Sequence, residues 1–127
     1  MRCVPLVVVR TVCKPTENAD KVIKSMLNIF PDLQIERKEE ELVGTTESTE
    51  TLEKLLREQQ IRSVARAIFL KSVDGNKLRF RLNKQVAFVG KVSFAERSSL
   101  GEIEVIIEDE RLLDLIDIIA PDLGEKS

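Results

Sequence analysis

The sequence predicts an α+β fold, with a mainly antiparallel β-sheet and helices packed on one of its faces. Three observations lead to this prediction. Apolar and polar residues alternate with a period of two over residues 77–83 and 102–108, which is typical of half-buried strands. Apolar residues recur at helical spacing over residues 22–30, 52–68 and 112–119. These patterns follow one another without the regular strand–helix–strand rhythm of a parallel sheet.

The first part of the chain predicts a strand, a helix and a second strand. Residues 4–14 are rich in Val and precede Pro15, which predicts a buried strand. The apolar stripe over residues 22–30 predicts a helix that ends at the following proline. Residues 33–43 predict a strand whose polar second half places it at an edge of the sheet. Residues 44–46 are expected to turn the chain.

Two helices are expected in the middle of the chain. Ser48 or Thr49 caps the first of them, whose buried stripe is Leu52, Leu55 and Leu56. The second covers residues 61–72, and its buried face is expected to carry Ile61, Val64, Ala65 and Ile68.

The basic strand over residues 77–83 follows a turn at Asp74-Gly75-Asn76. Its Leu78, Phe80 and Leu82 are expected to point into the core. After it we expect a short helical turn over residues 83–89, a strand over 91–95, a loop over 98–101 and the strand over 102–108.

The last helix is expected to begin at about Asp109, where acidic residues suit the positive end of the helix dipole. Six of the eight residues from Leu112 to Ile119 are apolar, a band wider than contact with one sheet face requires. The sequence therefore predicts a homodimer that forms through this helix.

The 127 residues are expected to fold as one domain over residues 1–120, with a short mobile tail over 121–127. Cys3 and Cys13 stand about 33 Å apart if the strand between them is straight, too far for a disulfide. A reduced, cytoplasmic protein is the resulting expectation. No apolar run approaches the roughly 20 residues of a membrane span, so no membrane partner is expected.

Charge is distributed in blocks along the chain. Residues 61–95 hold eight Lys/Arg against the single acid Asp74, a local net charge of +7. Residues 96–127 hold ten Asp/Glu against three Lys/Arg, a net charge of −7. Such blocks carry information about partners rather than about the fold, and the basic block points to a polyanion, RNA above all.

The candidate RNA interface is the basic strand with its flanks. Alternation places Lys77, Arg79 and Arg81 on one sheet face about 6.6 Å apart, close to the spacing of phosphates in a single strand. Arg62 and Arg66 are neighbours at i and i+4 and extend this surface if their helix lies on the same side. The candidate RNA-binding residues are Arg62, Arg66, Lys77, Arg79, Arg81, Asn83, Lys84, Gln85 and Lys91.

Two structural alternatives to RNA contact stay open. Glu102 and Glu104 neutralise the basic face if their strand pairs beside it. Asn83 or Gln85 serves a turn instead, by satisfying buried backbone groups. The phenylalanines, Phe80 foremost and then Phe88 and Phe94, are expected in the core rather than at a base-stacking platform.

The residue set excludes most catalytic chemistry. The chain contains no His, Trp or Tyr, so it has no imidazole base for a nucleophile and no His ligand for zinc. Asp114 and Asp117, at i and i+3, are expected to form the solvent stripe of a helix rather than a cation site. The glycines form no phosphate-binding loop. We therefore expect no enzymatic activity, no cofactor and no metal.

The segment Leu82-Asn83-Lys84-Gln85, followed by Gly90-Lys91, Phe94 and Leu100-Gly101-x-Ile103-x-Val105, resembles the archaeal uncharacterised protein family 0201. The resemblance runs the length of the chain, including the Val-rich opening strand. It implies an α+β fold similar to that of the ribosomal protein that binds 5S rRNA, together with an RNA-binding role. It implies no catalytic residues.

The sequence thus favours a non-catalytic RNA-binding protein that uses the face of Lys77, Arg79 and Arg81. The alternative is a protein-interaction or dimerisation module, in which oppositely charged blocks of different copies attract one another and RNA is not a ligand. A small-molecule-binding α+β domain is a third reading.

Overall fold

The computed structural model describes residues 5–95 and 102–122 of the chain. These residues form one sheet of six strands in the order β2-β3-β1-β6-β5-β4, with every neighbouring pair antiparallel. The strands are β1 (Leu6–Val12), β2 (Gln34–Lys38), β3 (Glu41–Thr46), β4 (Val73–Asp74), β5 (Lys77–Asn83) and β6 (Glu102–Glu108). The helices are α1 (Ala19–Ile29), α2 (Glu50–Glu58), α3 (Arg62–Lys71), α4 (Lys84–Phe88) and α5 (Leu112–Ile119). The predicted α+β class is confirmed.

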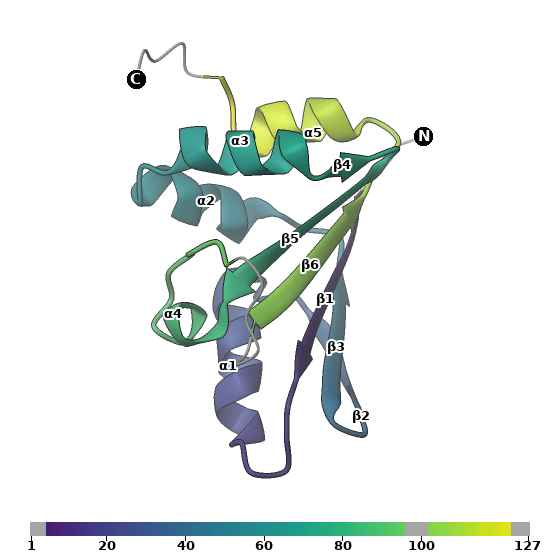
Figure 1. The fold of residues 1–127 in the computed structure, drawn as a ribbon, viewed down its shortest axis with the longest axis vertical. Coiled ribbons are helices and arrows are strands. Elements are labelled where there is room, and N and C mark those ends of the chain that lie inside the picture. The colour runs from purple at the N-terminus through teal and green to yellow at the C-terminus, as the bar shows by residue number, and fades with distance from the viewer. Residues whose placement is uncertain (1–4, 96–101, 123–127) are drawn as a thin grey trace.

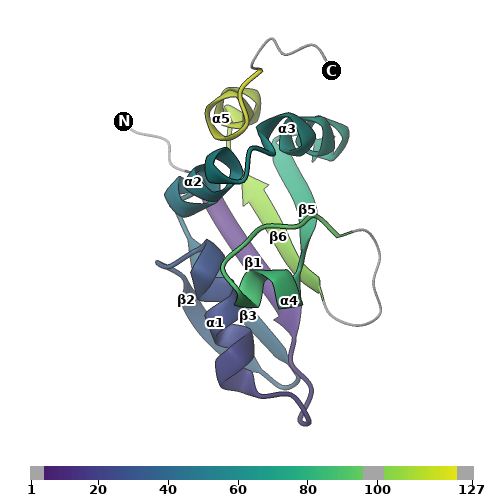
Figure 2. The same cartoon turned by 90° about the vertical axis from the view of Figure 1, so that its left-hand side faces the viewer.

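The helices leave one face of the sheet uncovered. Helices α1 and α4 lie against one face, while α2, α3 and α5 gather at one end of the strands (Figure 1). The view from the helix side shows α1 and α4 in front of the lower half of the sheet (Figure 2). None of the described helices lies over the opposite face, which we call the open face.

The core forms between the sheet and the helices. Val9, Val105 and Phe80 stand opposite one another on three adjacent strands, and all three are buried. Phe69 of α3 packs on Phe80 with ring centroids 4.8 Å apart, and Phe94 contacts both rings edge-on. The predicted core position of Phe80 is confirmed, and Phe94, which is partly buried, packs against the core as predicted. Interlocking aromatic rings of this kind contribute beyond the apolar area that they bury.

The single strand predicted over residues 33–43 is wrong, because this segment is the first part of a β-hairpin. Strands β2 and β3 pair through a tight turn at which Glu39 adopts a positive φ of 48°. Residues 44–46, expected to be a turn, lie inside β3. A Cβ at Gly44 would stand 2.9 Å from Leu33 Cδ2, so a residue without a side chain suits this part of the strand. The edge position of the polar strand is confirmed by β2.

Three smaller expectations also change. Val64 is 55% exposed, and Phe69 fills the buried face of α3 instead. The strand expected over residues 91–95 is reduced to one bridge between Leu82 and Phe94. Helix α5 begins at Leu112, three residues later than expected.

The loop expected over residues 98–101 and most of the tail expected over 121–127 lie outside the described residues. No helix in the described part of the chain has the length and apolarity that crossing a bilayer requires.

Candidate nucleic-acid interface

The outer side chains of β5 lie on the open face, as the alternation predicts. Lys77, Arg79 and Arg81 alternate with three buried apolar residues of the same strand. The turn before β5 is confirmed as well, since Gly75 adopts the positive φ of 64° that a tight hairpin between β4 and β5 requires.

Carboxylates of the neighbouring strand β6 form ion pairs with two of these three cations, Arg79 and Arg81. Arg81 Nε lies 3.1 Å from Glu102 and Arg81 Nη2 lies 3.9 Å from Glu104. Glu104 also stands 3.8 Å from Arg79 and 3.2 Å from Arg10 of β1. The expectation of an uncompensated basic face is therefore wrong for Arg79 and Arg81, for which the alternative of cross-strand ion pairing is confirmed.

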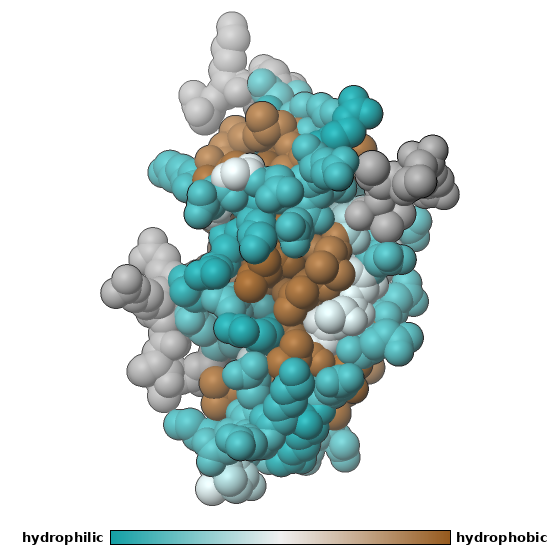
Figure 3. Space-filling model, turned by 90° about the vertical axis from the view of Figure 1, so that its right-hand side faces the viewer, coloured by the Kyte–Doolittle hydropathy of each residue, from teal (hydrophilic) through white to brown (hydrophobic). Residues whose placement is uncertain are grey.

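The open face as a whole carries a balanced charge. The strand register places on it the bases Arg10, Lys38, Lys77, Arg79 and Arg81 and the acids Glu36, Glu41, Asp74, Glu102, Glu104 and Glu108. An apolar patch formed by Leu6, Val8, Val43 and Ile106 lies among them, visible at the centre of the space-filling view (Figure 3). A nucleic-acid surface carries an excess of Lys and Arg, which this face lacks.

Two of the predicted RNA-binding residues make contacts that support the fold. Asn83 Oδ1 accepts a hydrogen bond from Val86 N–H at 3.0 Å and so caps α4, as the structural alternative holds. The buried Lys84 ammonium donates to the carbonyl of Val12 at 2.8 Å and lies 3.1 Å from Glu17 Oε2. The cap and the buried ammonium position α4 against β1 and the start of α1.

A third predicted residue, Arg66, connects two helices. Its Nη1 lies 2.7 Å from Asp117 Oδ1 and 3.1 Å from the carbonyl oxygen of Ala120. Asp114 is held by Arg111 at 3.0 Å. Each of the two α5 carboxylates thus has its own arginine, and the described residues contain no cluster of three or more His, Cys, Asp or Glu suited to a metal.

The remaining cations of interest lie on the helix side of the molecule. Asn28 of α1 donates to the carbonyls of Ala87 and Phe88 at 2.9 and 3.0 Å and thereby fixes α4 across α1. Lys24 Nζ lies 5.2 Å and Lys21 Nζ 6.0 Å from the centroid of the Phe88 ring. Phe88 is partly buried, as Phe94 is, but unlike Phe94 it is not packed against the buried core, so its predicted place in the core is wrong.

An open cleft of about 380 Å³ runs between α1 and α4 beside this ring. Its lining consists of Glu17, Asn18, Lys21, Val22, Ser25, Lys84, Gln85 and Phe88. The volume lies within the range of small-ligand sites, roughly 300–1,000 Å³.

The surface continues from α4 toward the junction of α2 and α3. Val92 exchanges two hydrogen bonds with the Gln59 side chain, at 2.7 and 2.8 Å. This contact brings the segment after α4, which includes Lys91, beside the end of α2, three residues before Arg62. Within the described part of the chain, Lys21, Lys24, Arg62 and Lys91 form no ion pair, and we call these four the helix-side cations.

Of the residues on this helix-side surface, the sequence analysis named Arg62, Gln85 and Lys91 but not Lys21 and Lys24. A signal was present, because the two lysines stand at i and i+3 on a helix and so share one side of it. They were overlooked because they lie outside the basic block of residues 61–95.

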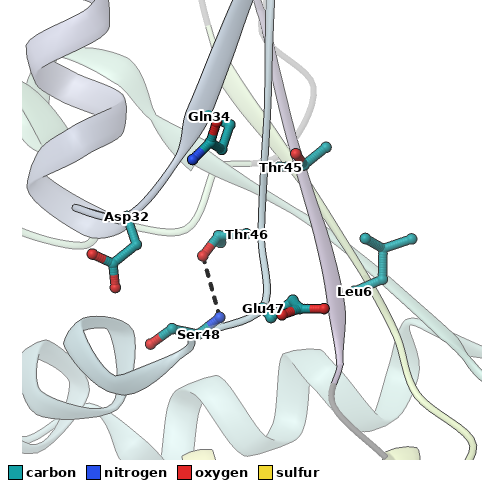
Figure 4. Close-up of a pocket in the computed structure, with 7 residues that line it drawn as sticks. All are labelled: Leu6, Asp32, Gln34, Thr45, Thr46, Glu47 and Ser48. Carbon is teal, nitrogen blue, oxygen red and sulfur yellow. Dashed lines mark hydrogen bonds between the residues drawn. The ribbon is translucent and has the colours of Figure 1, made fainter.

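A second hollow, of about 530 Å³, lies between the start of β1, the β2–β3 hairpin and the segment leading into α2 (Figure 4). Its lining consists of Leu6, Asp32, Gln34, Thr45, Thr46, Glu47 and Ser48, which include two carboxylates and no cation. The hydroxyl of Thr46 accepts from Ser48 N–H at 3.2 Å. Such a lining repels a polyanion.

Comparison with known proteins places the chain in a family. A family model described as RNA binding matches residues 6–108. A UPF0201 protein of Sulfolobus acidocaldarius is 40% identical over 126 residues, which covers 91% of this chain and 86% of the relative.

Two solved structures show the same fold. A crystal structure of an uncharacterised UPF0201 protein is 35% identical, with a TM-score of 0.89 over 95% of this chain and 97% of the other. The UPF0201 protein of Methanococcus jannaschii is 38% identical, with a TM-score of 0.84 over 92% of this chain and 93% of the other. The likeness to the 5S rRNA-binding ribosomal protein stays a prediction. By sequence and by fold, the chain belongs to the archaeal UPF0201 family.

Proposed function

We propose that this protein is a non-catalytic RNA-binding protein that holds RNA on its helix side, across α1 and α4. The RNA-binding description of the family model supports an RNA ligand, and the matched residues 6–108 include both helices. The observation that carries the choice of surface is the contrast in ion pairing. Arg79 and Arg81 are paired with carboxylates, whereas the helix-side cations are unpaired within the described residues.

Pairing matters because affinity for nucleic acid comes largely from cations that neutralise phosphates and release bound counterions. A cation that already faces a carboxylate must lose that partner first, and the carboxylate then repels the phosphate. The unpaired ammonium groups of Lys21 and Lys24 meet neither obstacle. The Arg62, Gln85 and Lys91 of the predicted interface belong to the same proposed surface.

Two double variants that remove equal charge test this placement. We expect Lys21→Gln with Lys24→Gln to weaken binding of a labelled single-stranded RNA, measured by fluorescence anisotropy at several salt concentrations. If both lysines contact phosphates, the slope of log K against log salt falls by about 1.4, because each single-strand contact contributes roughly 0.7. We expect Arg79→Gln with Arg81→Gln to leave the slope nearly unchanged.

Weaker binding only by the Arg79→Gln with Arg81→Gln variant would instead support the strand face predicted from the sequence. Full binding by both double variants would contradict both surfaces. Circular dichroism of each variant controls for loss of fold.

The open face favours a second candidate function, a protein-interaction or dimerisation module. This face combines an apolar patch with alternating charges of both signs, and charge-balanced rims around apolar centres are typical of protein interfaces. Salt-sensitive self-association of a protein that does not bind RNA would support this candidate. It is contradicted by a monomer at micromolar concentration that binds RNA.

A further inference from the structure

The chain places one aromatic ring outside its core. It contains no Trp or Tyr and five Phe, all within the described residues. Phe30 is 2% exposed, and Phe69, Phe80 and Phe94 pack on one another. Phe88 instead lines the open cleft between α1 and α4.

We propose that Phe88 is a stacking platform for one unpaired base of a single-stranded RNA, with Lys21 and Lys24 on the phosphates beside that base. The inference rests on the proposed function and adds to it the class of RNA and the residue that selects it.

In the free protein, two ammonium groups lie at cation–π distance from the Phe88 ring. The ammonium groups of Lys21 and Lys24 lie near the ring, at 6.0 and 5.2 Å from its centroid. A stacked base takes the place of these cations at the ring, and the flexible lysine stems let the ammonium groups reach the flanking phosphates. The base then stacks on the Phe88 ring and the ammonium groups neutralise the phosphates. A nucleotide therefore matches the ring and the two lysines better than a cation or an anion alone.

Hydrogen bonds and an ion pair hold part of the cleft lining in place. Lys84, one of its lining residues, is held by the carbonyl of Val12 and the carboxylate of Glu17. Asn28 fixes the backbone at the end of α4, because its side-chain amide donates a hydrogen bond to the Phe88 carbonyl at 3.0 Å. The exposed Gln85 amide lies in the same lining and offers a donor and an acceptor to a base edge or a ribose hydroxyl.

This arrangement selects against duplex RNA. In an A-form helix the bases are stacked on one another, and their flat faces are closed to a side chain. A single strand can turn one base outward and lay it on the ring. Phosphate contacts alone do not distinguish the two, so the preference for single strands comes from Phe88.

The test compares three labelled probes of about 12 nucleotides, within the usual site sizes of single-strand binding domains: a single-stranded RNA, its duplex, and a single strand without bases. We expect the wild-type protein to bind the base-bearing strand between about fivefold and about a hundredfold more tightly than the abasic strand. Phe88→Leu, which keeps an apolar side chain, should lose this difference, and Phe88→Tyr should keep it.

Each outcome decides a separate point. Equal affinity of the wild type for abasic and base-bearing strands overturns the stacking platform and leaves the proposed function standing. An unchanged preference in a folded Phe88→Leu variant overturns it too. Binding to none of the probes overturns the proposed function and this inference together. The abasic comparison uses the wild-type protein, so it does not depend on the folding of a variant.

Discussion

The Lys84 ammonium and the Glu17 carboxylate form an ion pair at 3.1 Å, with the Lys84 side chain 11% and the Glu17 side chain 33% exposed. The same ammonium donates to the carbonyl of Val12 at 2.8 Å. One charged group thus joins the end of β1, the segment before α1 and the first residue of α4. Both partners line the α1–α4 cleft.

Replacing Lys84 by Met should destabilise the protein. The variant leaves the Val12 carbonyl without its hydrogen bond and the Glu17 carboxylate without its cation, which together cost about 2 kcal/mol or more. Urea denaturation at neutral pH measures the loss. Lys24→Met removes an exposed lysine of the neighbouring helix and should change stability by less than about 0.5 kcal/mol. Equal stability of the two variants would contradict a structural role for Lys84.

Glu17 should make stability depend on acid pH. The Lys14 N–H bond and then the Lys84 ammonium lower the pKa of Glu17 from its ordinary value of 4.5. A carboxyl group with a lowered pKa in the fold stabilises it above the ordinary value, and the contribution disappears as the pH falls through the folded value. Glu17→Gln should therefore be less stable than wild type at neutral pH, and the gap should narrow below pH 4.5. A gap that stays constant with pH would refute this assignment.

Glu104→Gln should expose the basic row of β5 to polyanions. Glu104 lies within ion-pairing distance of Arg10, Arg79 and Arg81, at 3.2, 3.8 and 3.9 Å. We expect longer retention on heparin and a stability loss of no more than about 1 kcal/mol, since the arginines are partly exposed. Glu36→Gln makes the same change in charge on the open face without an arginine partner in the described residues. Equal retention of both variants would show that the ion pairs do not mask the row.

The predicted homodimer can be tested at α5. Leu112, Ile116 and Ile119 are buried within the chain, while Leu113 and Ile118 are 60% and 62% exposed. We expect Leu113→Glu with Ile118→Glu to convert a dimer into a monomer, as measured by light scattering. Val12→Glu changes an exposed residue of the open face and serves as the comparison. A monomer produced by Val12→Glu alone would move the contact to the sheet.

Glu53→Gln should stabilise the protein at neutral pH. Burial raises the pKa of Glu53, although its carboxylate accepts a hydrogen bond from Thr49 Oγ1 at 3.2 Å. A raised pKa means that the fold favours the protonated carboxyl, so stability falls as the pH rises through that value. Glutamine keeps an acceptor for Thr49 and removes the charge, and we expect a small rise in melting temperature. The rise should vanish in acid, where the wild-type carboxyl is protonated; a rise that persists there would point to a cause other than the charge.

The sequence was sufficient for elements whose pattern is local. The alternation over residues 77–83 predicted β5 with its buried and outer sides, because side chains point to opposite faces of any strand. The hairpin of β2 and β3 was missed, since the charged residues at its turn carry no Gly or Pro signal. Glu39 adopts the left-handed conformation without that signal.

The site could be predicted only in part, because ion pairing joins residues that are far apart in the chain. Arg81 and Glu102 stand 21 positions apart, and only the β5–β6 register brings them within 3.1 Å. The place of Phe88 likewise depends on α1, which meets α4 through Asn28. Local patterns left the first contact open as an alternative and contain no information on the second.

The sequence by itself determined which side chains can carry charge, where the helices and the strands of regular alternation form, and that any aromatic contact to a ligand must come from Phe. The tertiary structure alone decided which cations are neutralised and which ring stays at the surface. The physical reason is that Coulomb interactions and burial depend on distance in space, and the pairing of β6 with β5 and of α4 with α1 sets those distances.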